Sequence, residues 1–214
     1  MQILVTAATE MEIASFVNGS HDVDVLITGV GVPDTMYHLA KRLHQVHYDI
    51  IIQAGICGSF LNNDSAKCVL VKEDAFADIG IYENKNFFSV FDMGFSNANT
   101  FPYKNGFLKN ENAVLDKIDL GKVRAITVNS VGENKEQAAF LSSKYDPAIE
   151  TMEGAALHYV CLQEKVSFLQ LRAISNKVGE RDKSKWKMEE AIIELNKNLK
   201  NIVDELLSGN LNLK

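Results

Sequence analysis

The chain has 214 residues, of which 46% are hydrophobic and 23% are charged, and its formal net charge at pH 7 is −6. This length is sufficient for one domain with a large core, and we expect a single domain over residues 1–214. The negative charge argues against a nucleic-acid partner, because proteins that bind nucleic acids usually carry a basic patch.

Cysteine usage and hydropathy indicate the compartment. Cys57, Cys68 and Cys161 are an odd number of cysteines without a C-x-x-C pair, which is typical of a reducing compartment and not of a zinc site. The first apolar run is only a few residues long and has no basic segment before it, and no later run has the length of a membrane span. We therefore expect a cytoplasmic protein with no membrane partner.

Short apolar runs alternate along the chain with patterns of helical period. The runs predict strands at residues 3–7, 23–28, 49–54, 67–72, 123–129 and 166–175. Several of them are continuously apolar, as strands buried on both faces are. Helical spacing predicts helices at residues 34–45, 133–144, 153–163 and 187–207. This alternation predicts an α/β fold with a mostly parallel sheet between helix layers. Residues 80–112 have no clear period, and we expect irregular or edge structure there.

Several of the expected strands end in small or glycine-rich turns. These are Gly29-Val30-Gly31, the stretch "AGICGSF" at residues 54–60, and Ser175-Asn176. Glycine lets a ligand approach the backbone closely, although a single Gly-x-Gly is more often a tight turn. The spacing fits neither a dinucleotide-binding fingerprint nor a P-loop. Because such turns follow several strands of one sheet, they could line a shared crevice.

Two pairs of glutamates lie near these strand ends. Glu10 and Glu12 follow the first strand, and if that turn enters a helix, at most one of them can point into a given cleft. Glu150 and Glu153 flank Met152 directly before an expected helix. A glutamate in a first helical turn also stabilises the helix dipole. Each pair by itself therefore leaves a purely structural role open.

Taken in order, the motifs resemble those of a known enzyme family. A-x-E-x-E after the first strand, G-x-G, A-G-I-x-G, M-E-G-A-A and R-A-I-S-[DN] are similar to motifs of the purine nucleosidases in the nucleoside phosphorylase/hydrolase family. The resemblance extends over about residues 1–205 and is weakest between 80 and 125. It implies a three-layer α/β/α sandwich with a central mixed sheet, a homodimer, a small purine nucleoside as substrate, and no cofactor or metal.

The resemblance also implies roles for individual residues. Glu12 matches the glutamate that activates the attacking water, Glu153 the one that binds the ribose hydroxyls, and Asn176 the position that faces purine N7. Substrate contacts are implied for Gly55, Ile56, Cys57, Met152, Glu153 and Ser175. These roles suit cleavage of an N-glycosidic bond, in which one carboxylate stabilises the positive charge on the ribose and another removes a proton from water.

Charge near the first strand favours water over phosphate as the nucleophile. Phosphorylases of this family hold phosphate with arginines near the N-terminus, whereas the first arginine here is Arg42, inside an expected helix. Glu10 and Glu12, which follow the first strand, would repel a phosphate dianion. We therefore expect a hydrolase.

Asn176 bears on the identity of the purine. Adenosine-type nucleosidases have an aspartate there that can protonate N7, whereas an amide donates hydrogen bonds but no proton. An amide can pair with adenine. It can also turn both hydrogens toward N7 and the oxygen of a 6-oxopurine, which an ionised aspartate would repel. The stretch S-N-x-V-G-x-R is similar to that of the family members that hydrolyse futalosine to hypoxanthine and dehypoxanthine futalosine in menaquinone biosynthesis.

Other interpretations stay open at this stage. The substrate of a related nucleosidase would be methylthioadenosine, S-adenosylhomocysteine or aminodeoxyfutalosine, and a nucleoside-binding protein without turnover would belong to a different class. The presence of both Glu12 and Glu153 favours an enzyme. Arg181 could pair with the benzoate of futalosine or be an ordinary surface charge. Cys57 is expected to be a packing residue and not a nucleophile.

Overall fold

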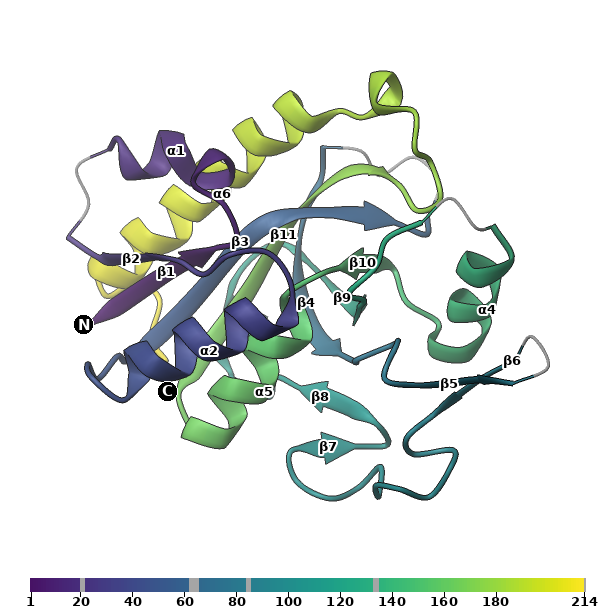
Figure 1. Ribbon diagram of the computed structural model, residues 1–214. Coiled ribbons are helices and arrows are strands. Elements are labelled where there is room, and N and C mark those ends of the chain that lie inside the picture. The colour runs from purple at the N-terminus through teal and green to yellow at the C-terminus, as the bar shows by residue number, and fades with distance from the viewer. Residues whose placement is uncertain (20–21, 62–65, 84–85, 133–134, 214) are drawn as a thin grey trace.

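The computed structural model describes residues 1–19, 22–61, 66–83, 86–132 and 135–213. A central sheet has helices on both sides (Figure 1). The strands are β1 (Ile3–Ala7), β2 (Asp24–Ile27), β3 (Ile50–Ser59), β4 (Cys68–Asp74), β5 (Gly80–Glu83), β6 (Asn86–Ser89), β7 (Tyr103–Lys104), β8 (Phe107–Lys109), β9 (Gly121–Thr127), β10 (Ile149–Thr151) and β11 (Ser167–Lys177). The helices are α1 (Glu10–Val17), α2 (Val32–Leu43), α3 (Val114–Lys117), α4 (Lys135–Tyr145), α5 (Gly154–Glu164) and α6 (Met188–Leu207).

The central sheet is mixed, and part of it closes on itself. β2, β1 and β3 are parallel neighbours. β3 is parallel to β11, and β11 is antiparallel to β4. β4 is parallel to β9, β9 is parallel to β10, and β10 returns antiparallel to the end of β3. One apolar cluster has members from every strand of this ring, as expected for side chains that point inward.

Residues of the central strands alternate between two apolar layers. Ile3 and Val5 of β1 belong to a cluster with α1 and α6, whereas Leu4 between them packs with α2 and α5. Figure 1 shows α6 and α1 on one side of the sheet and α2 and α5 on the other. Side chains on both faces are removed from water, which explains the continuously apolar strand sequences. The prediction of a mixed sheet between helix layers is confirmed.

Most of the expected elements are found, with small differences at their ends. Residues 133–134 of the helix expected at 133–144 lie outside the described residues. The expected edge structure at residues 80–112 is confirmed, since β7 and β8 lie at one edge of the main sheet and β5 and β6 form a separate hairpin. β10 was not predicted. Among the described helices, none combines the length and the apolar character that a membrane span needs.

The prediction that "AGICGSF" forms a glycine-rich turn is wrong. β3 runs through this stretch to Ser59, because β11 pairs with it along one side and β10 pairs with Gly58 and Ser59 on the other. Between these pairings the Ile56 N–H donates to the Glu12 side chain. β11 likewise continues through Ser175 and Asn176, with a shift of register between Ile174 and Asn176. Such an irregularity re-aims a side chain while the strand continues. Sheet strands, and not loops, therefore hold these candidate site residues.

Candidate active site

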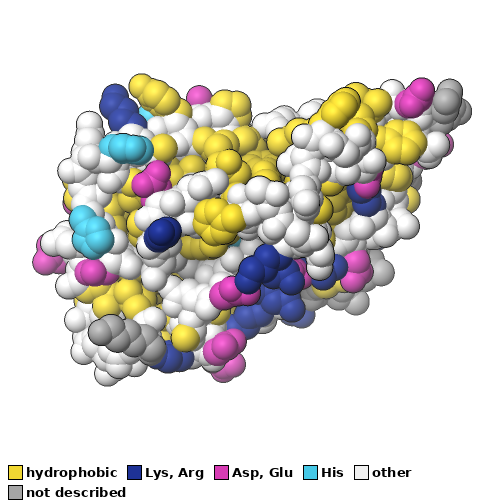
Figure 2. Space-filling view, turned by 90° about the horizontal axis from the view of Figure 1, so that it is seen from below, with side chains coloured by type: hydrophobic (Ala, Val, Ile, Leu, Met, Phe, Trp, Pro, Cys, Tyr) yellow, Lys and Arg dark blue, Asp and Glu magenta, His cyan; other side chains and the backbone are white. Residues whose placement is uncertain are grey.

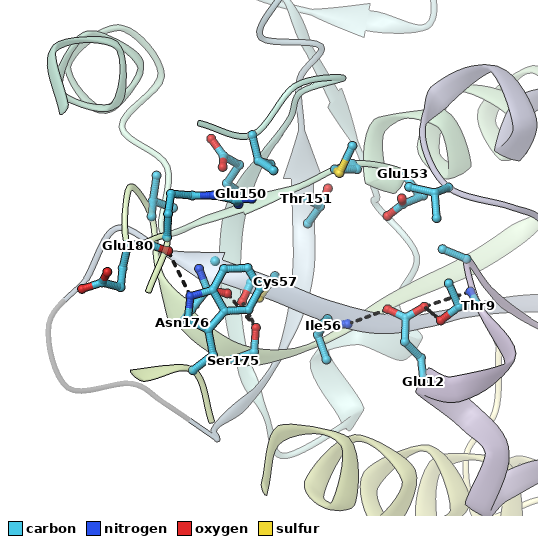
Figure 3. A pocket seen from close by; sticks show the side chains of 18 of the residues that line it. Thr9, Glu12, Ile56, Cys57, Glu150, Thr151, Glu153, Ser175, Asn176 and Glu180 are labelled. Carbon is cyan, nitrogen blue, oxygen red and sulfur yellow. Dashed lines mark hydrogen bonds between the residues drawn. The ribbon is translucent and has the colours of Figure 1, made fainter. Parts of the chain in front are cut away.

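A pocket of about 240 Å³ lies where β1, β3, β10 and β11 end (Figure 3). The carboxyl ends of parallel strands are the usual place for ligands in open α/β sheets. Glu12 lines the pocket and Glu10 does not, as their spacing predicts. The candidate residues that line it are Glu12, Ile56, Cys57, Met152, Glu153, Ser175 and Asn176.

Glu12 is 6% exposed, and α1 and β3 hold its two carboxylate oxygens. One oxygen accepts hydrogen bonds from the backbone N–H and the hydroxyl of Thr9, each at 3.0 Å, in a capping box at the start of α1. The other accepts the backbone N–H of Ile56 at 3.1 Å. The Asn196 side chain of α6 donates to the Glu12 carbonyl at 2.8 Å. Glu12 therefore caps a helix and also faces the pocket, so the two roles considered for it coexist.

Glu153 precedes α5, and its carboxylate is bound by groups from two other elements. One oxygen accepts the backbone N–H of Gly31 at 3.0 Å, where a φ of +91° at the start of α2 favours glycine. The other oxygen lies 3.8 Å from a guanidinium nitrogen of Arg172. Burial raises the pKa of Glu153, while Arg172 and the Gly31 N–H act in the opposite direction. Both partners thus favour the ionised carboxylate in a buried place.

Arg172 of β11 is a buried cation close to both carboxylates. It is 1% exposed and donates a hydrogen bond to the Gln53 side chain. A Cβ atom on Gly55 would lie 2.2 Å from a guanidinium nitrogen of Arg172 and 3.0 Å from a Glu12 oxygen. Gly55 does not line the pocket. Instead it leaves the space in which Arg172 and Glu12 approach each other. Sequence reasoning missed this role of Arg172, because its partners come from distant parts of the chain.

A chain of hydrogen bonds fixes the start of α5. The N–H of Gly154 donates to the Thr151 hydroxyl at 3.2 Å, and that of Ala155 donates to the Thr127 hydroxyl at 2.8 Å. The Thr127 hydroxyl donates to Asp74 at 3.0 Å, so its contact with Thr151, also 3.0 Å, has Thr151 as the donor. These hydroxyls cap the helix in place of Glu153, whose side chain stays free to face the pocket.

The amide of Asn176 has one orientation. Its nitrogen donates to the Lys177 carbonyl at 3.0 Å, and its oxygen accepts from the Ser175 hydroxyl at 2.8 Å. Exchanging oxygen and nitrogen would bring two acceptors together at the Lys177 carbonyl, so the network fixes the assignment. The second N–H of the amide remains available, and the pocket therefore offers a hydrogen-bond donor at this end.

Arg181 and Trp186 also line the pocket. The guanidinium of Arg181 lies over the Trp186 ring, 5.6 Å from its centre, and the Trp186 N–H donates to the Glu180 carbonyl at 3.0 Å. No carboxylate in the described part of the chain forms an ion pair with Arg181, and pairing with a substrate carboxylate stays a prediction.

Burial raises the pKa of Cys57 to about 12, so it is a neutral thiol.

No group of three or more His, Cys, Asp and Glu side chains in the described structure is arranged to hold a metal ion. The pocket contains the carboxylates of Glu12 and Glu153, near the buried Arg172, and the neutral amide of Asn176. Two acids at one end and a hydrogen-bond donor at the other are the groups that cleavage of a glycosidic bond to a purine requires.

The comparisons with known proteins identify the family of this chain. Residues 5–208 match the model of the phosphorylase superfamily, and the chain belongs to this superfamily. Among curated proteins it is similar to the futalosine hydrolase of Thermus thermophilus, with 30% identity over 189 residues that cover 84% of this chain and 80% of the relative. The family resemblance inferred from the sequence motifs is thus confirmed.

Solved structures show the same fold at low identity. The futalosine hydrolase of Helicobacter pylori has a TM-score of 0.80 and 17% identity, covering 96% of this chain and 98% of that one. The 5′-methylthioadenosine/S-adenosylhomocysteine nucleosidase of Helicobacter pylori, with butyl-thio-DADMe-Immucillin-A, also has a TM-score of 0.80, at 18% identity, covering 96% and 99%. The fold therefore does not distinguish these two activities, and a distinction between them has to come from the residues that line the pocket.

The hydrogen-bond chain that starts α5 makes a first prediction. Thr127→Val removes the acceptor for Ala155 and Thr151 and should lower the free energy of unfolding by about 2 kcal/mol, because buried donors lose their partners. It should also lower kcat/KM about tenfold, because Glu153 directly precedes this helix start and a shift of the helix would displace its carboxylate. Urea unfolding and nucleosidase assays measure both effects. Thr127→Ser, which keeps the hydroxyl, is the control, and equal behaviour of the two variants would contradict this role.

Proposed function

We propose that this chain is an N-glycosyl hydrolase that cleaves futalosine to hypoxanthine and dehypoxanthine futalosine in menaquinone biosynthesis. The observation that carries the proposal is that Glu12, Glu153 and Asn176 line one pocket, in a chain whose curated relative over 84% of its length is a futalosine hydrolase. The pocket chemistry supports the bond that is cleaved and the base that leaves. The relative supports the identity of the 5′ substituent.

The reaction distributes its charges over this pocket. The bond between C1′ and N9 breaks with its electron pair moving to the purine, while a water oxygen bonds to C1′. Glu153 accepts hydrogen bonds from the ribose hydroxyls and stabilises the positive charge on the sugar. Glu12 removes the proton from the attacking water. Asn176 donates a hydrogen bond to the departing purine, which leaves as an anion and takes up a proton afterwards.

The charges support water as the nucleophile. Glu12 and Glu153 both reach the pocket, and the buried cation near them, Arg172, already faces Glu153 at 3.8 Å. Arg42 lies in α2 beside Asp24, at 3.7 Å, and does not line the pocket. A phosphate dianion beside Glu12 and Glu153 would therefore meet two carboxylates and a cation that already faces one of them, since Arg181, which also lines the pocket, lies over Trp186 at the other end.

The amide of Asn176 supports a 6-oxopurine as the leaving base. Asn176 lines the pocket with one N–H that the Lys177 carbonyl does not use, and its oxygen already accepts from Ser175. N7 and O6 of hypoxanthine are both acceptors, whereas adenine places an amino donor at position 6. A 6-oxopurine is also the better anionic leaving group, so it needs a hydrogen bond and not a full proton from the enzyme.

We also propose that the chain acts as a homodimer in the cytoplasm. Residues 80–112 leave Tyr82, Phe95 and Phe101 each at least 61% exposed, and exposed aromatic surface of this kind favours association. The face in Figure 2 carries several groups of hydrophobic side chains among scattered charges.

All three cysteines are free, which supports a reducing compartment.

A substrate panel tests the proposed function. Futalosine, aminodeoxyfutalosine, methylthioadenosine and inosine are offered with and without inorganic phosphate, and the free base is measured. We expect futalosine to have the highest kcat/KM and the rate to be independent of phosphate. A preference for methylthioadenosine, or release of a sugar phosphate, would contradict the proposal.

Within the same assay, Glu12→Gln should lower kcat by a factor of about 10²–10⁴, because a neutral amide cannot accept the water proton. Glu10→Gln is a matched control, since Glu10 is in the same helical turn and does not line the pocket. Its kcat should equal that of the wild type. If Glu12→Gln retained full turnover, Glu12 would not be the base.

Replacing the amide of Asn176 tests the choice of purine. Asn176→Asp should lower kcat/KM for futalosine about tenfold relative to aminodeoxyfutalosine, because an ionised carboxylate repels the 6-oxo oxygen and loses the donor. The ratio of the two substrates in one variant serves as an internal control for folding and concentration. An unchanged ratio would show that the amide does not select the base.

A further inference from the structure

Asn176, Gly58 and Glu150 form a row across three neighbouring strands. Gly58 of β3 is in register with Asn176 of β11 on one side and with Glu150 of β10 on the other. Side chains in register on neighbouring strands point to the same face of a sheet. All three residues line the pocket, and Figure 3 shows Glu150 and Asn176 on either side of it.

Gly58 keeps the middle of this row free of side-chain atoms. A Cβ atom on Gly58 would lie 3.0 Å from a methyl group of Val178 and 3.5 Å from the amide nitrogen of Asn176. Neighbouring strands lie about 4.8 Å apart, so the backbones that carry Asn176 and Glu150 are about 10 Å apart. This span accommodates a planar purine that has one hydrogen-bonding edge on each side.

Glu150 has no partner within the described protein. Its carboxylate forms no hydrogen bond or ion pair there, although Met152, two residues further along and on the same face of the chain, also lines the pocket. Burial, followed by the nearby charge of Asp78, raises the pKa of Glu150 to about 7. A carboxylate that is partly buried without a partner is poised to gain from a hydrogen-bond donor on a ligand.

We infer that Glu150 is a specificity-determining residue that accepts the N1–H of a 6-oxopurine while Asn176 contacts the opposite edge of the same base. This inference rests on the proposed nucleosidase function. A 6-oxopurine carries a hydrogen on N1, whereas N1 of a 6-aminopurine is an acceptor that faces a carboxylate unfavourably. Asn176 and Glu150 together therefore match the donor and acceptor pattern of hypoxanthine along two edges.

The test compares two substrates that differ only at position 6, futalosine and aminodeoxyfutalosine. Glu150→Leu should lower kcat/KM for futalosine by about 10- to 100-fold, the usual effect of losing a hydrogen bond to a charged group. The value for aminodeoxyfutalosine should stay within about threefold. Glu180→Gln is the matched control, because Glu180 lines the pocket but pairs with Lys185 at 2.8 Å, and it should leave the substrate ratio unchanged.

Binding of the free bases provides a readout that does not depend on turnover. Calorimetry with hypoxanthine and adenine should show that Glu150→Leu weakens the binding affinity for hypoxanthine by at least tenfold and leaves the affinity for adenine unchanged. Equal losses for both bases, or no loss for either, would overturn the inference. If the wild type cleaved no nucleoside, the proposed function would fail, and the binding experiment would still decide the role of Glu150.

Discussion

The placement of one buried cation, Arg172, near the carboxylates of Glu153 and Glu12 is the constraint on which the rest of the pocket depends. Glu12 and Glu153 are each 6% exposed, and two negative charges with so little water around them repel each other. Arg172 offsets this repulsion. It reaches the position because Gly55 has no side chain, and Gln53 holds its far side. Removing Arg172 would leave the buried Glu153 carboxylate without its cation, which is costly.

The pocket divides into an end for the sugar and an end for the base. The sugar end contains Glu12, Glu153 and the buried cation, and three separate elements tie the carboxylates down through Thr9, Ile56 and Gly31. The base end has a neutral amide and, we infer, a carboxylate that reads the purine. Positive charge develops on the sugar at the first end, and the purine leaves as an anion at the second. This division explains why acids lie near the ribose. It also explains why an amide, which donates a hydrogen bond but transfers no proton, is sufficient near a 6-oxopurine.

Sequence patterns were sufficient for the layers of the fold and for the pocket-lining position of Asn176. The central strands are buried on both faces, and this leaves an apolar run that can be recognised in one sequence. The stretch "AGICGSF" gave a wrong prediction, because glycines that usually mark turns here lie inside a strand. Gly55 makes room for Arg172, and Gly58 leaves the pocket surface there without side-chain atoms. Contacts such as that of Arg172 with Glu153 depend on how β11 packs against the start of α5, and no local pattern encodes that.

The most direct test of the central claim is the pH profile of kcat/KM for the wild type, Arg172→Met and Arg172→Lys. Arg172 lowers the pKa of Glu153, so its removal should raise the pKa of Glu153 and move the acid limb to higher pH by about one unit or more. Arg172→Lys keeps a charge and should return the limb toward the wild-type position. Circular dichroism confirms that each variant is folded. An acid limb that stays in place in a folded Arg172→Met variant would contradict the account.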